Sequence, residues 1–341
     1  MCSHTPADAV AVESAQGACS LVQPLVSVII PTHNRPAETR RAVLSALAQT
    51  ERKIEIIVID DGSSNPQELQ DALTDLADPR LVLKLLSPNR GANHARNHGV
   101  AISRALYVAF LDSDDEWLPT KLECQLAQLR TAEQPTVSFC RFRTVIDQSR
   151  ESDEPAQPRR APARGERIDE YLFCRRGGIV TPSIVMRRDL ALAHPFDERL
   201  KRHQDFAFIL KLAAAGVNFD MVDESLVIVH WETLYETRRH INLEASRQFL
   251  REYASYMSLA ARACFWARCA VIPLLCDNRR RDALRAAMSE PKLTLYLLGW
   301  PRIGIMMFFG FIGVNPLALA GLKRRIFRFG RRQSPRSRSP A

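Results

Sequence analysis

The sequence lacks the short motifs that most directly identify a nucleotide-binding or zinc-binding protein. It contains no G-x-x-x-x-G-K-[ST] segment, no G-x-G-x-x-G segment after an apolar run and no C-x-x-C pair. Without a glycine-rich cradle, a bound phosphate must be held by side chains or by a metal ion. The eight cysteines are scattered, which argues against a zinc cluster or a disulfide framework and is typical of a reducing cytoplasm.

Acidic residues are missing from the C-terminal end, where most of the net positive charge lies. The formal net charge is +9, and residues 323–341 hold eight Lys and Arg but no acid, so the other residues carry +1 (9 minus 8). A nucleic-acid-binding protein spreads basic residues over its folded body, so we expect no nucleic-acid partner. Residues 1–24 have neither a basic residue nor a long apolar run, and we expect a disordered lead instead of a signal peptide.

Short apolar runs alternate with helical patterns in the first half of the chain. The runs fit buried strands at 26–30, 54–59, 81–86 and 106–111, and the segments between them fit helices at 36–50, 66–76 and 92–104. This alternation predicts an α/β fold with a mainly parallel sheet covered by helices on both faces. Ligands of such sheets bind beyond the carboxyl ends of the strands.

The second half of the chain has a looser pattern. The stretch 147–167 is polar and contains three prolines, which indicates an exposed loop. A helix is expected at 205–215, ended by Gly216, and a strand at 226–229. From about residue 233 onward the pattern is helical.

Acidic residues follow two of the predicted strands. Asp60-Asp61 ends the second run and Asp112-Ser113-Asp114 the fourth. A single acidic cluster is more often a turn or a helix cap, and Asp115 could be such a cap. Two clusters at one sheet edge repel each other unless a cation joins them. In an extended Asp-x-Asp segment both carboxylates point the same way, which suits Mg²⁺ or Mn²⁺ bridging to a diphosphate.

Four segments, in this order and spacing, resemble family-2 glycosyltransferases of the GT-A fold. They are VIIPTHNR at 28–35, IVIDDGS at 57–63, NRG at 89–91 with ARNHG at 95–99, and AFLDSDDEW at 109–117, followed by a weaker match, RHQD, at 202–205. The resemblance covers about residues 25–230. It implies an inverting, metal-dependent enzyme that moves one sugar from a nucleotide-sugar to an acceptor hydroxyl. It also suggests a product in the bacterial envelope, such as lipopolysaccharide or capsule, built on a glycan or lipid-linked acceptor.

The resemblance also implies roles for individual residues. The nucleotide-sugar would be contacted by Pro31, Thr32, His33, Asp61, Arg96, Asp112 and Ser113, the Mn²⁺ or Mg²⁺ would be held by Asp112 and Asp114, and Asp205 would be the catalytic base. Asp61 would accept the uracil imide N–H, which makes UDP the expected nucleotide. His33 and Gln204 depart from the family pattern, which more often has Tyr and Glu there. His230 could approach the metal, although a lone histidine at a strand end is more often structural.

The resemblance divides the chain into three regions. Residues 1–24 form the lead, 25–232 the catalytic region and 233–341 a helical extension. Within the catalytic region, 25–130 would bind the nucleotide and 131–232 the acceptor.

The extension contains an apolar segment at 293–322 and the basic tail at 323–341. Residues 303–322 carry no charge and would reach about 30 Å as a helix, but Pro316 disfavours one straight span. We expect two short segments in one leaflet, with the tail on anionic head groups at the cytoplasmic side of the inner membrane. The alternative is that 293–322 packs as ordinary core.

Other functions remain open at this stage. A phosphatase of the haloacid-dehalogenase type also ends a strand in Asp-x-Asp, although usually on the first strand. A non-catalytic protein that binds sugar nucleotides or assists assembly is a second alternative, to which Gln204 gives slight support. A processive synthase would carry a Q-x-x-R-W motif and several membrane spans, and neither is present.

Overall fold

The computed structural model describes residues 23–145, 155–175, 177–230 and 242–298, together with residues 305, 307, 308 and 310. Most of the predicted N-terminal lead and the whole basic tail lie outside these residues. So do the first part of the polar loop and nearly all of the uncharged segment 303–322.

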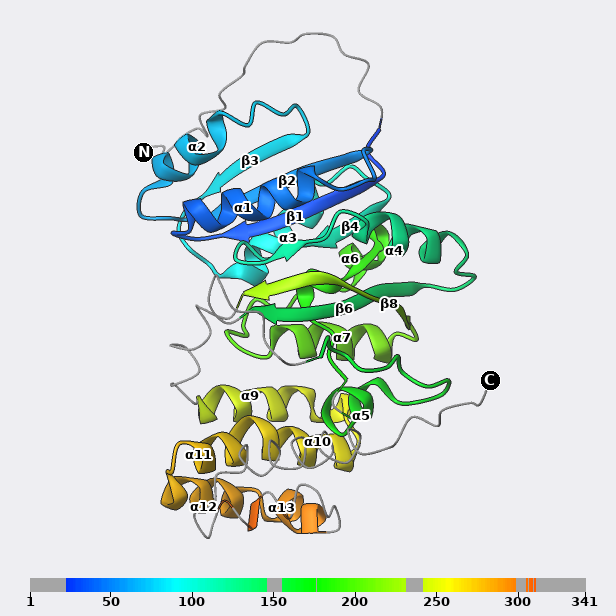
Figure 1. Cartoon of the computed structure of the whole chain (residues 1–341). Helices are drawn as coiled ribbons and strands as arrows, with labels where there is room; N and C mark the ends of the chain where they lie inside the picture. The colour runs from blue at the N-terminus through cyan, green and yellow to red at the C-terminus, as the bar shows by residue number, and fades with distance from the viewer. Residues whose placement is uncertain are drawn as a thin grey trace, which may run out of the picture.

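One eight-stranded sheet forms the body of the protein, in the strand order β3-β2-β1-β4-β7-β6-β8-β5 (Figure 1). The strands are β1 (Val26–Thr32), β2 (Ile54–Asp61), β3 (Leu81–Leu86), β4 (Tyr107–Phe110), β5 (Glu116–Trp117), β6 (Thr136–Val145), β7 (Val185–Arg187) and β8 (Asn218–His230).

The first four strands in this order are parallel, as the sequence predicts. Every residue of β1 and β2 is buried. Alternate side chains enter two cores: Ile29 packs with α3 (Ala92–Ile102) on one face, and Val28 packs with α1 (Pro36–Leu47) on the other. Helices therefore cover both faces of this half, which confirms that part of the prediction.

The sheet as a whole is mixed but mainly parallel, which agrees with the prediction, because β6 and β8 also pair parallel and run in the same direction as β4. β7 runs antiparallel to β4 and β6, and β5 runs antiparallel to β8. The two strands that oppose this direction, β5 and β7, have only two and three residues, which is too short for an alternation of apolar and polar residues to show in the sequence.

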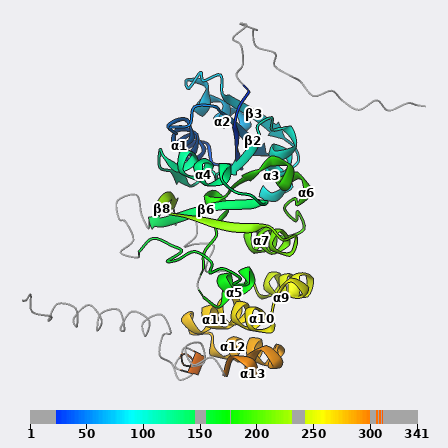
Figure 2. The same ribbon diagram turned by 90° about the vertical axis from the view of Figure 1, so that its right-hand side faces the viewer.

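Helices form the remaining elements. They are α2 (Pro66–Thr74), α4 (Lys121–Arg130), α5 (Ile168–Phe173), α6 (Arg188–Ala193), α7 (Gln204–Ala214), α9 (Leu243–Tyr253), α10 (Leu259–Trp266), α11 (Ile272–Cys276), α12 (Arg280–Ser289) and α13 (Pro291–Leu298). A π-helical turn, Ala267–Val271, joins α10 to α11. Figures 1 and 2 show α9 to α13 stacked below α7, at the end of the molecule opposite β3 and α2.

These C-terminal helices share one hydrophobic core with the sheet. The cluster that contains Ile29 and Phe110 also contains Phe249, Trp266 and Leu297. The apolar stretch Leu259–Cys276 is the one helix among the described residues with the length and composition of a membrane span, but 67% of it is buried inside the protein. Burial in this core accounts for its apolar character.

Candidate active site

The carboxyl ends of β1, β2 and β4 bring the predicted site residues to one edge of the sheet. In the β1–β2 register Thr32 lies opposite Asp60, and in the β1–β4 register Ile29 lies opposite Phe110. Asp112 follows Phe110 by two residues, in a turn closed by the hydrogen bond from the Asp115 N–H to the Asp112 carbonyl (3.0 Å). Both acidic clusters therefore flank the end of β1, as predicted.

Arg96 is the central cation of this edge. It lies on α3, is buried, and donates from Nη2 to Asp112 Oδ1 (2.5 Å). Its Nη1 lies 3.4 Å from Gln204 Oε1, at the start of α7. Burial lowers the pKa of Arg96, but Asp112 and Asp205 raise it more, so the guanidinium stays charged. Arg96 thus joins the Asp-x-Asp turn to the first turn of α7, which carries Asp205.

Two further arginines form hydrogen bonds with Asp114: Arg35, just before α1, and Arg41, within α1. Arg35 Nη1 donates to Asp114 Oδ2 (2.6 Å), and Arg41 Nη2 donates to the Asp114 carbonyl (2.7 Å). No sequence pattern singled out Arg41. Arg35 lay within a matched segment but had no assigned role. Cations therefore already surround both predicted metal ligands.

Asp115 is not a helix cap, contrary to the alternative weighed from the sequence. Its side chain is buried, and Oδ1 accepts the His230 N–H (3.1 Å), which ties the turn to the end of β8. Burial, followed by the charges of Asp112 and Asp114, raises the pKa of Asp115 well above its usual value.

The imidazole of His230 pairs with Glu116. His230 Nε2 lies 2.7 Å from Glu116 Oε1, and Arg41 Nε lies 3.3 Å from the same oxygen. The histidine therefore links β8 to β5, which is the structural role expected of a lone histidine at a strand end.

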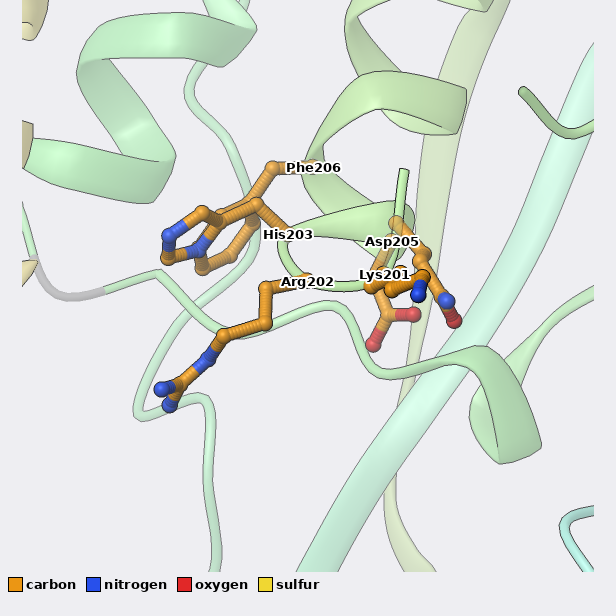
Figure 3. Close-up of a pocket in the computed structure, with 6 residues that line it drawn as sticks. Lys201, Arg202, His203, Asp205 and Phe206 are labelled. Carbon is orange, nitrogen blue, oxygen red and sulfur yellow. The ribbon is translucent and has the colours of Figure 1, made fainter. Parts of the chain in front are cut away.

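Asp205 lies in the first turn of α7 and lines an open pocket of about 270 Å³ formed by residues 201–206 (Figure 3). Its Oδ1 accepts the Thr181 hydroxyl (2.6 Å), from the short 3₁₀ turn Thr181–Ser183. Burial and then the charge of Asp112 raise the pKa of Asp205, while Arg96 and Thr181 oppose the shift. No local sequence pattern marked Thr181, because it lies 24 residues before Asp205.

His203 forms the wall of this pocket away from Asp205. Its ring stacks on Phe206 and meets Phe265 edge-on, and Nε2 lies 2.9 Å from Ser246 Oγ. Figure 3 shows the His203 and Phe206 rings together, apart from the carboxylate of Asp205. Burial and the charge of Arg202 lower the pKa of His203 to about 4, so its ring is neutral at pH 7.

At the end of β2, Asp61 is oriented by backbone donors. Its carboxylate accepts the N–H groups of Arg90 (3.1 Å) and Gly91 (2.6 Å). The adjoining Gly62 has φ +70°, and a Cβ there would lie 2.6 Å from the Asn89 nitrogen. Only glycine allows the two loops to approach this closely.

The three residues predicted to border the nucleotide base differ in how far their side chains are exposed. Thr32 is buried and its hydroxyl pairs with Thr39 (2.7 Å), so it fastens α1 to β1. Pro31 is buried opposite Ile59. His33 is exposed, with Nδ1 3.1 Å from the Asp61 carbonyl. Of the three, His33 is the side chain that a ligand could contact.

Asp112 and Asp114 offer the oxygen ligands that suit Mg²⁺ or Mn²⁺. Their side chains keep 28% and 21% of their surface exposed. Within the described residues, no group of three or more His, Cys, Asp or Glu is placed to hold a metal alone. Two carboxylates nevertheless fit an ion that takes other ligands from a substrate diphosphate, which is the usual mode for Mg²⁺.

Known proteins resemble this chain in sequence and in fold. Residues 27–192 match the family model described as glycosyl transferase family 2. The amylovoran biosynthesis glycosyltransferase AmsB of Erwinia amylovora is 32% identical over 216 residues, which are 61% of this chain and 70% of that protein. The UDP-Glc:alpha-D-GlcNAc-diphosphoundecaprenol beta-1,3-glucosyltransferase WfaP of Escherichia coli is 38% identical over 107 residues, which are 31% of this chain and 42% of that protein.

A solved structure extends the likeness to the whole fold. The crystal structure of S. aureus TarS 1–349 in complex with UDP superposes with a TM-score of 0.53 and 18% identity, covering 87% of this chain and 92% of that one. A second TarS structure, with UDP-GlcNAc, has a TM-score of 0.52 and 20% identity, covering 72% of each chain. The mixed sheet with flanking helices is therefore shared with TarS.

Proposed function

This chain belongs to glycosyl transferase family 2, and from that membership we propose that it moves a single sugar from a UDP-sugar to an acceptor hydroxyl, with inversion at the anomeric carbon. One observation carries the proposal most directly. Arg96 joins Asp112, at the donor end of the site, to Gln204 beside Asp205. The predicted donor site and the predicted base are therefore parts of one site.

Asp205 is the base in this mechanism. The acceptor hydroxyl gives its proton to the Asp205 carboxylate, its oxygen bonds to the anomeric carbon, and the bond from that carbon to the diphosphate breaks. The electron pair of that bond leaves with the nucleoside diphosphate. A pKa raised toward the working pH makes a carboxylate a better proton acceptor than an ordinary one. Burial around Asp205 provides this shift.

The other residues at this edge of the sheet would bind the donor. His33, Asp61 and their loops would hold the base, with Pro31 and Thr32 as the framework beneath. Arg96 and Ser113 would lie at the diphosphate. Mn²⁺ or Mg²⁺ held by Asp112 and Asp114 would neutralise the leaving diphosphate.

The relatives support a place in cell-envelope glycan synthesis. AmsB is named for amylovoran biosynthesis and WfaP for transfer to a diphosphoundecaprenol-linked sugar. TarS structures contain UDP or UDP-GlcNAc, which supports a UDP-sugar donor. A glycan or lipid-linked acceptor follows by analogy, and nothing in the charge pattern favours a nucleic acid.

We place the catalytic region at 25–232 and the membrane-associated extension at 233–341. The enzyme would be held at the cytoplasmic side of the inner membrane through its C-terminus. The basic tail 323–341 supports this placement, because clustered Lys and Arg bind anionic head groups.

A panel of UDP-, GDP- and dTDP-sugars with Mn²⁺ or Mg²⁺ tests the reaction, with the anomeric configuration of the product read by NMR. We expect turnover of a UDP-sugar. In the Asp205→Asn variant, turnover should fall by at least about a hundredfold while the affinity for the donor is unchanged. If donor affinity collapses in that variant, Asp205 belongs to the donor site. Phosphate release from simple phosphoesters without UDP binding would indicate a phosphatase, and UDP binding without turnover a binding protein.

A further inference from the structure

Helix α12 has an unusual outer face. Its inner side consists of the buried Ala283, Ala286 and Ala287. The opposite side carries Arg281, Leu284, Arg285 and Met288, all exposed and spaced as one helical stripe. Leu284 is 54% exposed and Met288 67%. In a helix packed on a soluble domain, the side away from the core is normally polar, so these two apolar side chains need an explanation.

Helix α13 repeats the pattern. Leu293 and Leu297 face the core. Lys292, Leu295 and Tyr296 are exposed at the i, i+3 and i+4 spacing of one face, with Leu295 66% exposed. Both helices thus turn a mixture of aliphatic and basic side chains outward. Helix α13 adds a tyrosine, a residue enriched where one end of a side chain is apolar and the other wet.

The charge of this surface is net positive. Residues 279–298 contain five basic residues and two acidic ones. One of the two acids, Asp282, is paired with Arg279 (2.9 Å) and lies 3.5 Å from Arg285. Figures 1 and 2 both place α12 and α13 at one extremity of the molecule, beyond α9 and α10. An apolar and basic surface at an extremity is suited to a flat, anionic partner.

We propose that the outer face of α12 and α13, formed by Arg281, Leu284, Arg285, Met288, Lys292, Leu295 and Tyr296, docks on an anionic lipid bilayer. The apolar side chains enter the head-group and acyl boundary, and the basic ones contact lipid phosphates. This inference deepens the membrane attachment proposed above, because it assigns a folded surface to the bilayer in addition to the chain beyond it.

Two observations favour lipid over a second copy of the chain. A symmetric dimer would set the arginines of α12 against those of another α12, and like charges brought together at an interface cost binding energy. In the sequence, α13 is also followed by the uncharged segment 303–322 and then by the basic tail 323–341. The docked face and these segments would therefore meet the same surface.

The test uses the full chain with vesicles containing phosphatidylglycerol and brominated lipids. An environment-sensitive fluorescent amino acid is placed at Met288, at Leu295 or, as the matched control, at Leu192 of α6, which is 43% exposed but lies away from this face. We expect the emission at positions 288 and 295 to shift to the blue and to be quenched by the brominated lipids, and the emission at 192 to be unchanged. Equal quenching at all three positions, or none, overturns the proposal.

A second measurement compares vesicle partitioning of Met288→Glu/Leu295→Glu with that of Leu106→Glu/Leu192→Glu. Both variants keep the C-terminal segments, so a difference in binding between them measures the contribution of the outer face of α12 and α13. We expect the first variant to bind about tenfold more weakly than the second, because its apolar contribution is replaced by charge. Equal partitioning, or loss of a dimer in the first variant by sedimentation, contradicts docking on lipid. UDP affinity, measured on the same proteins, separates this outcome from a failure of the proposed catalytic function.

Discussion

At the scale of single residues, the pKa of Asp205, the proposed base, sets the pH dependence expected of the reaction. Burial and Asp112 raise its pKa, while Arg96 and the Thr181 hydroxyl lower it. Because the base must be ionised to accept a proton, kcat/KM should rise as the pH passes through this raised pKa. The hydrogen bond from Thr181 favours the ionised form, and a small substitution can remove it without changing either predicted metal ligand.

We predict that Thr181→Val moves the acid limb of the kcat/KM profile to higher pH. Valine nearly matches threonine in volume but cannot donate to the carboxylate, so the pKa of Asp205 rises further. The matched control is Thr136→Val on β6, a buried threonine that bonds to the Gln134 carbonyl instead. If Thr181→Val lowers activity equally at every pH, its hydroxyl does not tune the base.

Asp114 provides the second prediction at this scale. Asp114→Asn should abolish metal-dependent transfer and leave the fold intact, since the change removes charge from the metal site but almost no volume. Turnover is measured across a Mn²⁺ titration, and Asp75→Asn, at an exposed ion pair with Arg40, serves as the control. Full activity of the Asp114 variant, or of the unmodified enzyme in excess EDTA, would show that no metal is needed.

His203 makes the stability of the protein depend on pH. Its folded-state pKa is lowered to about 4 from 6.5, so the unfolded chain binds a proton that the folded chain does not between these values. The stabilisation is therefore complete above about pH 6.5 and is lost as the pH falls toward 4. In His203→Asn, which tolerates the observed φ of 61°, the free energy of unfolding should decline less over that window. Denaturant titrations at several pH values measure this, and unchanged curves would refute it.

At the scale of elements, helix α13 has one side in the hydrophobic core and the other side on the surface. Leu297 is buried against α10, whereas Leu295, two residues earlier, faces outward. For residues 293–297 this favours the core alternative left open by the sequence, and a chain cut after residue 290 would uncover α10. The uncharged segment 303–322 lies almost wholly outside the described residues, so its placement stays a prediction.

We predict that Leu297→Ala destabilises the protein by about 2–4 kcal/mol, the usual cost of emptying a buried leucine site. Leu295→Ala, on the same helix with the same chemistry, should change stability by no more than about 0.5 kcal/mol. Chemical denaturation in the absence of lipid compares the two. Equal effects would mean that α13 does not belong to the core.

At the scale of the whole molecule, the proposed base-binding end of the site is built from segments that are far apart in the sequence. Asp61 from β2 is held by the Arg90 and Gly91 amides before α3, and His33 from the end of β1 lies against the Asp61 carbonyl. A ligand bound there therefore stabilises the packing of three elements at once, and its affinity should appear as a rise in the unfolding temperature.

We predict that UDP with Mn²⁺ raises the unfolding temperature more than GDP does at the same concentration. The reason is that the uracil edge offers one N–H, which suits the Asp61 carboxylate. Calorimetric titration with each nucleotide provides the affinities, and Asp61→Asn should reduce the preference for UDP. Tighter binding of GDP would overturn the assignment of Asp61.

The sequence by itself determined the first four strands, their helices and the edge at which the acids gather. Those strands are buried on both faces, so their apolar runs are local signals that no distant contact can alter. The order of strands along the chain then places Asp61 and Asp112 at one edge. The spacing of Asp112 and Asp114 was likewise readable, because side-chain direction in an extended segment repeats every two residues.

Only the tertiary structure decided how that edge is completed. The bond from Thr181 to Asp205, the bridge of Arg96 to Gln204, and the tie of Asp115 to β8 each join segments that are 24 to 115 residues apart. Sequence periodicity reports whether a residue is buried, but not which distant group it meets. Those pairings depend on how β7 and β8 pack into the sheet, and contacts between segments so far apart along the chain leave no local pattern in the sequence.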